Sequence, residues 1–421
     1  MFKKTVGMKV AASIFAAAMA ASSAMPVLAA DNYTPVSGTE MYFGKYLIMD
    51  QEANVPPVTF TYTIAAGEGK SYDVDGRKFE ILAGVDADKV KFSQTPEATF
   101  KPGDPTYTTA QTGTNIKNTK EEALVDQVDL KDGEKYARAE VKIDFSGAKY
   151  TEPGVYRYVL TEAESPAAYT GIKNDEAATR VIDVYVTDDN GTLKIAGYVM
   201  HSASDDITMS ENNGTNGADP AGKSKGFNNE YITHDLEIKK DVSGSQASRD
   251  QYFKFDVVIE GAVPGTKFDV IGVTGSTPTA DARVKENAAT KQEYVGQENV
   301  TTLTAGEDGT VRQSFYLSHG QSIKINGIPN AAKYSVTETE ESYKPSVTVT
   351  GDTDATSTDG KKVEDKSTGI TADTTNAFVN TKEGVIPTGL IMEAGPYATV
   401  FLTGVVGVIG ATIVMRKKKE S

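Results

Sequence analysis

Apolar and polar residues alternate along many short segments of this chain, and segments with a helical repeat are almost absent. Residues 41–45 alternate toward one face, and residues 58–64 are β-branched or aromatic throughout. Gly, Asn and Asp separate such segments, as in the hairpin turn Asp189-Asn190-Gly191. This pattern predicts an all-β chain of β-sandwiches. The other predicted strands are 141–145, 154–160, 181–186, 193–195, 227–229, 236–240, 252–259, 313–317, 322–325, 334–338, 346–349 and 377–380.

Three polar stretches interrupt the predicted strands. Residues 65–136 contain scattered Gly, Pro and Thr, which indicates long loops and short strands that decorate the first domain. Residues 202–225 and 352–373 are each predicted as a polar loop before the last strand of a domain. The arrangement predicts two tandem sandwich domains, residues 31–232 and 233–382.

The two ends of the chain carry export signals. Lys3 and Lys4 precede a small-residue apolar stretch that ends near Ala29 and Ala30, which is typical of a secretory signal peptide over residues 1–30. Within the tail, residues 383–421, an apolar run over 398–415 is followed by four cations at 416–419. This order predicts a transmembrane helix with a cytoplasmic basic end, so the body of the protein is expected to face outward.

Three polar residues occur twice in the same order, each on the apolar face of a predicted strand. Each half opens with an apolar-x-apolar-x-Lys strand, later has a Tyr-x-aliphatic-Thr-Glu strand, and ends with Phe-x-Asn. Because side chains alternate across a strand, the Lys, Glu and Asn share a face with their apolar neighbours. The residues are Lys45, Glu162 and Asn229 in the first half, and Lys240, Glu338 and Asn380 in the second.

These residue types have a specific chemistry when they are buried together. Desolvation lowers the pKa of a Lys and raises that of a Glu, which leaves a neutral amine beside a neutral acid. The amine is then a nucleophile, and the acid polarises the Asn carboxamide and relays protons. Attack with loss of ammonia gives a Lys-Asn isopeptide bond. One such triplet is equally well explained by strand-end charges that reach water, but two in the same order favour the cross-link.

Composition narrows the function further. The chain has no Cys, so an exported form cannot rely on disulfides or use a thiol nucleophile. The formal net charge of −15 argues against a nucleic-acid partner. No cofactor and no metal site are expected, because the three His are scattered and the stretch with Asp352, Asp354, Asp359 and Gly360 lacks the spacing and the terminal Glu of a calcium loop.

The segment Val385-Ile386-Pro387-Thr388-Gly389 resembles a variant sortase sorting signal, since it keeps Pro-Thr-Gly ahead of the apolar run and the basic end. Together with the repeated strands, it makes the chain resemble a Gram-positive major (backbone) pilin of the streptococcal type. The resemblance implies two immunoglobulin-like sandwiches of the collagen-adhesin B type, with Lys45 joined to Asn229 through Glu162 and Lys240 joined to Asn380 through Glu338. Asn228 competes with Asn229 for this role, Lys239 adjoins Lys240, and the segment around Glu338 lacks the Ala-Pro of the family's E-box.

The resemblance also implies a mode of assembly. Pilin-type and housekeeping sortases would cut between Thr388 and Gly389 and join Thr388 to a Lys of the next copy, to minor pilins or to peptidoglycan. The accepting Lys would be Lys223 or Lys225, and we favour Lys223 because Lys225 is nearer the strand. The expected product is a covalent pilus shaft anchored in the cell wall, and the subunit is not expected to be an enzyme.

Two other functions fit parts of the sequence. A singly wall-anchored adhesin or minor pilin would bind a host ligand through residues 65–136. A wall-anchored glycan hydrolase would need two carboxylates in an exposed cleft, whereas the recurrent Glu residues are predicted on buried faces.

Overall fold

A computed structural model describes residues 38–74, 77–92, 97–117, 123–202, 224–274, 277–279, 300–339 and 342–384. Strands make up nearly all of its regular structure, and the helical part of these ranges is one 3₁₀ turn, η1 (Ala87–Lys89). The all-β prediction is therefore confirmed. The described ranges contain no helix whose length and hydropathy suit a membrane crossing. The predicted signal peptide and the apolar run at 398–415 lie outside these ranges.

The first sandwich consists of two facing sheets. One sheet has the order β12-β15-β1-β10-β5, with β7 also paired to β10; the other has the order β14-β13-β11-β2-β6, with β4 paired to both β11 and β3. Strands β8 and β9 form a separate pair. The bounds are β1 (Glu40–Asp50), β2 (Thr59–Ala66), β3 (Lys70–Val74), β4 (Arg77–Ala83), β5 (Lys91–Phe92), β6 (Glu97–Thr99), β7 (Thr106–Tyr107), β8 (Thr112–Lys117), β9 (Ala123–Val125), β10 (Glu134–Asp144), β11 (Gly154–Glu162), β12 (Ile172–Lys173), β13 (Thr179–Asp189), β14 (Thr192–Ser202) and β15 (Gly226–Tyr231).

The second sandwich repeats this plan with fewer decorations. Its sheets have the orders β19-β18-β22-β16-β27-β24, with β20 paired to β18, and β21-β17-β23-β26-β25. The bounds are β16 (Thr233–Ser243), β17 (Phe253–Glu260), β18 (Lys267–Thr274), β19 (Thr277–Thr279), β20 (Thr302–Thr304), β21 (Val311–Leu317), β22 (Gln321–Pro329), β23 (Lys333–Thr339), β24 (Lys344–Thr350), β25 (Thr356–Thr358), β26 (Lys362–Asp365) and β27 (Thr374–Thr381).

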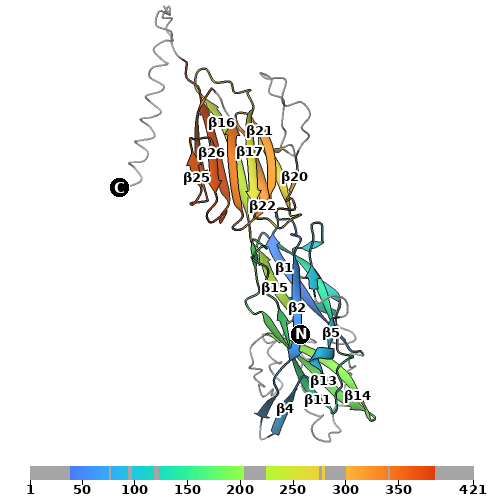
Figure 1. Ribbon diagram of the computed structural model, residues 1–421. Helices are drawn as coiled ribbons and strands as arrows, with labels where there is room; N and C mark the ends of the chain where they lie inside the picture. The colour runs from blue at the N-terminus through green and yellow to red at the C-terminus, as the bar shows by residue number, and fades with distance from the viewer. Residues whose placement is uncertain are drawn as a thin grey trace, which may run out of the picture.

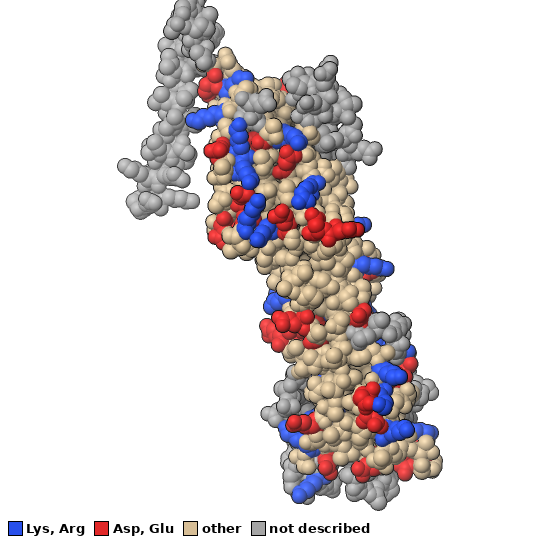
Figure 2. Space-filling view, in the orientation of Figure 1, with Lys and Arg blue, Asp and Glu red and all other residues tan. Residues whose placement is uncertain are grey.

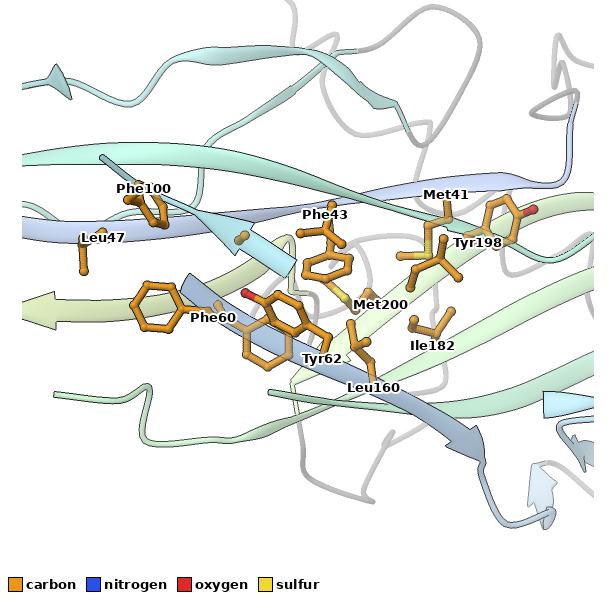
Figure 3. Packing of buried hydrophobic residues seen from close by; sticks show 14 of the residues in the cluster. Met41, Phe43, Leu47, Phe60, Tyr62, Phe100, Leu160, Ile182, Tyr198 and Met200 are labelled. Atoms are coloured by element: carbon orange, nitrogen blue, oxygen red, sulfur yellow. The ribbon is translucent and has the colours of Figure 1, made fainter. Parts of the chain in front are cut away.

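The first strand of each sandwich lies in the middle of its sheet, beside the last strand. β1 pairs antiparallel with β10 and parallel with β15, and β16 likewise pairs antiparallel with β22 and parallel with β27. Alternation along β1 turns Phe43 and Leu47 into the core between the sheets (Figure 3). There Phe43 meets Tyr62 from β2 in an edge-to-face contact with ring centroids 4.9 Å apart. Because β1 and β16 lie inside their sheets, the side chains on their inner faces are buried.

The two sandwiches lie end to end (Figure 1). Ile232 is the single residue between β15 and β16, so the last strand of the first sandwich is followed almost immediately by the first strand of the second. Polar contacts cross the junction: the Thr233 hydroxyl donates to Asp50 at 3.1 Å, and Lys324 pairs with Glu52 at 2.9 Å. Val263 of the second sandwich packs into the core cluster of the first. The junction therefore has both apolar and polar contacts.

The polar stretches contain more strands than their composition suggests. β10 begins at Glu134, inside the stretch predicted as decoration, and pairs with β1 along its whole length. The predicted loop at 352–373 contains the hairpin β25–β26, whose turn places Asp359 and Gly360 at φ 52° and 64°. Strands β18, β19 and β20 were also missed. The short strands β19, β20 and β25 contain few apolar residues, so their hydrophobic period is weak. β18 does alternate from Lys267 to Val270, so its pattern was present in the sequence and was overlooked.

Candidate functional site

The first candidate site lies inside the first sandwich, where three strands bring Lys45, Glu162 and Asn229 together. Their exposed fractions are 0%, 4% and 0%. Lys45 Nζ is 2.8 Å from both carboxylate oxygens of Glu162, and Asn229 Nδ2 donates to Glu162 Oε1 at 2.8 Å. A single carboxylate oxygen therefore contacts both the amine and the amide nitrogen.

The surroundings of Lys45 favour its neutral form. Burial lowers the pKa of Lys45 to about 8, although the charge of Glu162 opposes the shift. The Phe60 ring centroid lies 4.3 Å from Nζ. Across the sheet from Glu162 is Tyr62, whose pKa is raised well above its ordinary value by burial and then by the Glu162 charge. A pKa near 8 leaves roughly a tenth of the Lys45 amines neutral at pH 7.

The amide oxygen of Asn229 has its own hydrogen-bond donor. The backbone N–H of Asp175 donates to Asn229 Oδ1 at 2.9 Å. The Asp175 carboxylate in turn accepts from the Arg180 guanidinium at 2.6 Å and from the backbone N–H of Asn228 at 2.7 Å. The side chain of Asn228 instead donates to the carbonyl of Gln127 at 3.1 Å. Of the two adjacent Asn residues, Asn229 is the one that contacts the Glu.

The second sandwich holds the corresponding residues in the same register. Lys45 is opposite Phe227 and Leu47 is opposite Asn229 across the parallel pair β1–β15, just as Lys240 is opposite Phe378 and Val242 is opposite Asn380 across β16–β27. In both sandwiches the Asn is therefore opposite the residue that follows the Lys by two positions. Since side chains alternate along a strand, the Lys and the Asn point to the same face of the sheet in each case.

The distances of the second site are close to those of the first. Lys240 Nζ is 2.7 Å from Glu338 Oε1, and Asn380 Nδ2 donates to the same oxygen at 2.7 Å. All three residues are at most 2% exposed. The Phe253 ring centroid lies 4.3 Å from Lys240 Nζ. The neighbouring Lys239 points outward and pairs with Glu237 at 2.9 Å.

The two sites differ around the amide oxygen and the carboxylate. Asn380 Oδ1 is buried and has no hydrogen-bond donor among the described residues, whereas the oxygen of Asn229 has the Asp175 N–H. The residue paired with Glu338 is Phe255, where the first sandwich has Tyr62. Asp175 lies outside the three repeated strands, so the sequence motif did not indicate it. The one local hint in the sequence is that Asp175 shortly precedes β13, the strand that carries Arg180.

The residues expected to join subunits are described only in part. Lys223 and the segment Val385-Ile386-Pro387-Thr388-Gly389 lie outside the described ranges. Lys225 is half-buried, and burial lowers its pKa. Its backbone N–H donates to Gln127 at 2.9 Å. Beside this point lies a solvent-open pocket of about 310 Å³, lined among others by Gln127, Asp175 and Arg180.

Three observations on the described residues bear on a polyanion partner, a glycan hydrolase and a metal site. Basic and acidic side chains are interspersed on the visible face of both sandwiches (Figure 2), which does not suit a polyanion. Glu162 and Glu338 are buried, as stated above, and do not line an open cleft. Within the described ranges, no group of three or more His, Cys, Asp and Glu side chains has the geometry of a metal site.

Comparison with known families and proteins identifies relatives along most of the chain. Residues 91–232 match the family described as Spy0128-like isopeptide containing domain, and residues 234–382 match a domain of unknown function (DUF7601). A pilin of Streptococcus pyogenes serotype M1 is 23% identical over 390 residues, which cover 91% of this chain and 92% of the relative. The pilus tip adhesin Cpa of Streptococcus pyogenes is 29% identical over 163 residues, 38% of this chain and 19% of the relative.

Two solved structures of pilins align with most of this chain. The major pilin from Streptococcus pyogenes aligns over 83% of this chain and 100% of its own, with 22% identity and a TM-score of 0.49. The major pilin T3.2 from Streptococcus pyogenes serotype GAS13637 aligns over 84% of this chain and 100% of its own, with 17% identity and a TM-score of 0.48. The family match at 91–232 and the pilin relative confirm that the chain resembles a streptococcal pilin.

Proposed function

We propose that this chain, which resembles streptococcal major pilins along nearly its whole length, is the repeating shaft subunit of a covalent surface pilus. The observation that carries the proposal is the pair of buried Lys-Glu-Asn triads, each linking the first strand of a sandwich to the last. The full-length similarity to a pilin favours a shaft subunit over a tip adhesin, since the similarity to Cpa covers 38% of the chain. The role is structural, and each triad reacts once.

The bond-forming step follows from the contacts of Glu162. Lys45 Nζ attacks Asn229 Cγ, a C–N bond forms, and the bond from Cγ to Nδ2 breaks with release of ammonia. One proton must move from the attacking nitrogen to the leaving nitrogen. Glu162 Oε1 lies 2.8 Å from both nitrogens, so it accepts the proton from one and delivers it to the other. Glu338 Oε1 has the same two contacts in the second sandwich.

The proposed bonds stabilise the fold and resist tension. If each acts as a cross-link that closes a loop of more than 100 residues, it contributes about 5 kcal/mol in the chain-entropy model. Each bond also joins two parallel neighbouring strands in the middle of a sheet. Without the bond, only hydrogen bonds would hold these two strands together under tension. A chain without Cys gains in this way the covalent support that disulfides give to other exported proteins.

Assembly is proposed from the sequence signals and the relatives. A pilin sortase cleaves after Thr388 and transfers its carbonyl to Lys223 or Lys225 of the next copy, and a housekeeping sortase attaches the finished polymer to peptidoglycan. Minor pilins join the same polymer. The lowered pKa of Lys225 supports it as an acceptor because an amine must be neutral to attack a thioester, while its half-buried position favours Lys223.

Intact mass tests the internal bonds. The purified chain, with its termini mapped, should be lighter than its sequence by two ammonia molecules, about 34 Da. Lys45→Ala and Lys240→Ala should each restore about 17 Da, and the exposed neighbour in Lys239→Ala should restore nothing. A chain at its full sequence mass contradicts the cross-links.

Polymer formation tests the shaft role separately. Co-expression with a pilin sortase should give a ladder of covalent multimers that the Lys223→Ala/Lys225→Ala double variant cannot form. An intact ladder in the double variant would show that the acceptor lies elsewhere. Monomers attached singly to peptidoglycan, with no ladder from the parent chain, would favour the adhesin.

A further inference from the structure

A second group of buried polar side chains lies in the second sandwich, apart from Lys240. Tyr334 precedes Glu338 by four residues on β23, and Asn376 precedes Asn380 by four residues on β27. Both therefore face the core, where Tyr334 is 1% and Asn376 0% exposed. Asp365 pairs with Tyr334 across β23–β26. This group lies toward the start of β16 and hence toward the junction with the first sandwich.

Two carboxylates in this group are buried without a cation. Asp352 is 5% exposed and Asp365 1% exposed, and neither forms an ion pair with a described Lys, Arg or His. The nearby Lys362 and Lys366 both pair with Glu364 instead. The two carboxyl groups belong to segments that contact each other: the Thr368 hydroxyl lies 2.9 Å from Asp354 Oδ2, in the loop of Asp352, and 3.0 Å from Asp365 Oδ2. Two adjacent buried negative charges are unfavourable unless something neutralises them.

Neighbouring oxygen atoms are also left without partners. Neither amide atom of Asn376 has a hydrogen bond, and Oδ2 of Asp352 has no donor among the described groups. The Tyr334 hydroxyl is next to both of these side chains and forms no well-aligned hydrogen bond with either. Because buried polar atoms in folded proteins are nearly always paired, the acceptor oxygens Asp352 Oδ2 and Asn376 Oδ1 indicate a missing partner that is a cation or a hydrogen-bond donor.

The other carboxylate oxygens are held in place by the loops that carry them. Asp352 Oδ1 accepts from the backbone N–H of Asp354 at 2.9 Å, and Asp365 Oδ1 accepts from the backbone N–H of Ser367 at 2.8 Å. The Thr368 hydroxyl bridges Asp354 and Asp365 at 2.9 and 3.0 Å. Such hydrogen bonds fix the orientation of ligating carboxylates in metal sites.

We propose that Asp352, Asp365 and Asn376 bind a calcium ion at the base of the second sandwich. The donors are all oxygens, which suits a hard cation, and a charge of +2 balances the two carboxylates. Calcium tolerates the irregular geometry that these loops impose and completes its shell with water or carbonyl oxygens, whereas magnesium requires a near-ideal octahedron. The ion links the loop after β24 to the end of β26.

The position gives this site a structural role. The loop after β26 is tied to the turn after β22 by hydrogen bonds between the backbones of Ala331 and Ile370, at 2.8 Å, and of Ile370 and Ala332, at 2.9 Å. That turn contacts the inter-sandwich residue Ile232, whose carbonyl accepts from the Asn330 N–H at 2.9 Å. Calcium at this point would therefore stiffen the junction between sandwiches, independently of the Lys-Asn cross-links.

Calcium binding is tested on the full chain, purified in detergent after treatment with a chelator. Native mass spectrometry with calcium chloride should show one bound ion, an increase of about 38 Da because two protons leave as calcium binds. The unfolding temperature of the second sandwich should rise by roughly 5 °C at saturating calcium and much less with magnesium. Asp352→Asn and Asp365→Asn should lose both effects.

Asp359→Asn provides the matched control. Asp359 is exposed in the same loop region, at a turn with positive φ that Asn tolerates, so this variant should bind calcium as the parent does. Circular dichroism checks that each variant is folded. Equal calcium binding in all variants, or an unfolding temperature that calcium does not change, overturns the proposal. A rise in unfolding temperature in Asp352→Asn that is the same with and without calcium indicates a shared proton in place of the ion.

Discussion

In the first sandwich the backbone N–H of Asp175 donates to the amide oxygen of Asn229, whereas the corresponding oxygen of Asn380 in the second sandwich has no donor among the described residues. The other parts of the two sites agree closely: each Lys is buried against a Phe ring, and one carboxylate oxygen of each Glu, Oε1, contacts both nitrogens. The repeated motif therefore sets the approach of the reactants, and the loops around it set their electrostatic surroundings.

This difference has a kinetic consequence. Negative charge develops on the Asn oxygen when the amine adds to the carboxamide, and a fixed N–H aimed at that oxygen stabilises the transition state. The first site has such a donor in place before the reaction. We therefore expect the bond between Lys45 and Asn229 to form faster than the bond between Lys240 and Asn380.

The largest effect should come from removing the Asp175 N–H. Asp175→Pro deletes this donor and should slow the first bond roughly 100-fold, since single oxyanion donors commonly contribute that much to a rate. The rate of the second bond should not change. Ammonia loss after refolding, followed by peptide mass mapping of each sandwich, measures both rates.

Asp175→Ala is the control for this variant, because it keeps the N–H and removes the carboxylate that contacts Arg180. If Asp175→Ala is as slow as Asp175→Pro, the carboxylate and its ion pair are responsible for the rate. Equal rates of the two bonds in the parent chain would contradict the comparison itself.

A smaller effect should appear in the pH dependence of stability before the bond forms. Asn229→Ala keeps Lys45 as a free amine with a pKa of about 8, below its ordinary value near 10.5. Between pH 8 and 10.5 the unfolded chain then binds more protons at this residue than the folded chain, so stability should rise with pH, by an amount on the order of 3 kcal/mol. Below pH 8 both states are protonated and this contribution is absent.

Denaturant unfolding across this pH range measures the effect, with the Lys45→Met/Asn229→Ala double variant as the reference that lacks the amine. A double variant with the same slope as Asn229→Ala would mean that other groups cause the dependence. The same measurement on Asn380→Ala tells whether Lys240 behaves as Lys45 does.

The smallest effect is expected from exchanging the aromatic residues opposite the two Glu side chains. Tyr62→Phe gives the first site the residue type that the second has in Phe255. The Tyr62 hydroxyl is buried and forms no well-aligned hydrogen bond, so its removal should change the free energy of unfolding by less than about 1 kcal/mol. Chemical denaturation measures this change. A loss of more than about 3 kcal/mol would show that the hydroxyl is a structural partner of Glu162.

Much of the fold follows from local patterns. Strands such as β17 and β27 alternate strictly between buried and half-buried residues, and the turn Asp189-Asn190-Gly191 has residues that adopt positive φ at low cost. Strands with a weak period could not be predicted in this way. β26, for example, is a four-residue strand inside a stretch rich in Asp and Lys, and its pairing with β23 is what makes it regular.

Local alternation is enough to tell which Lys, Glu and Asn side chains face the core, because it fixes the side of the strand to which each one points. The groups that surround them depend on the folded arrangement of the chain. Asp175 reaches Asn229 from a loop 54 residues away, and the loop of Asp352 and Asp354 is joined to Asp365 at the end of β26 through Thr368. Such contacts depend on how loops return to the sheets, which no local period encodes, so both the oxyanion donor and the proposed calcium site became visible only in the folded chain.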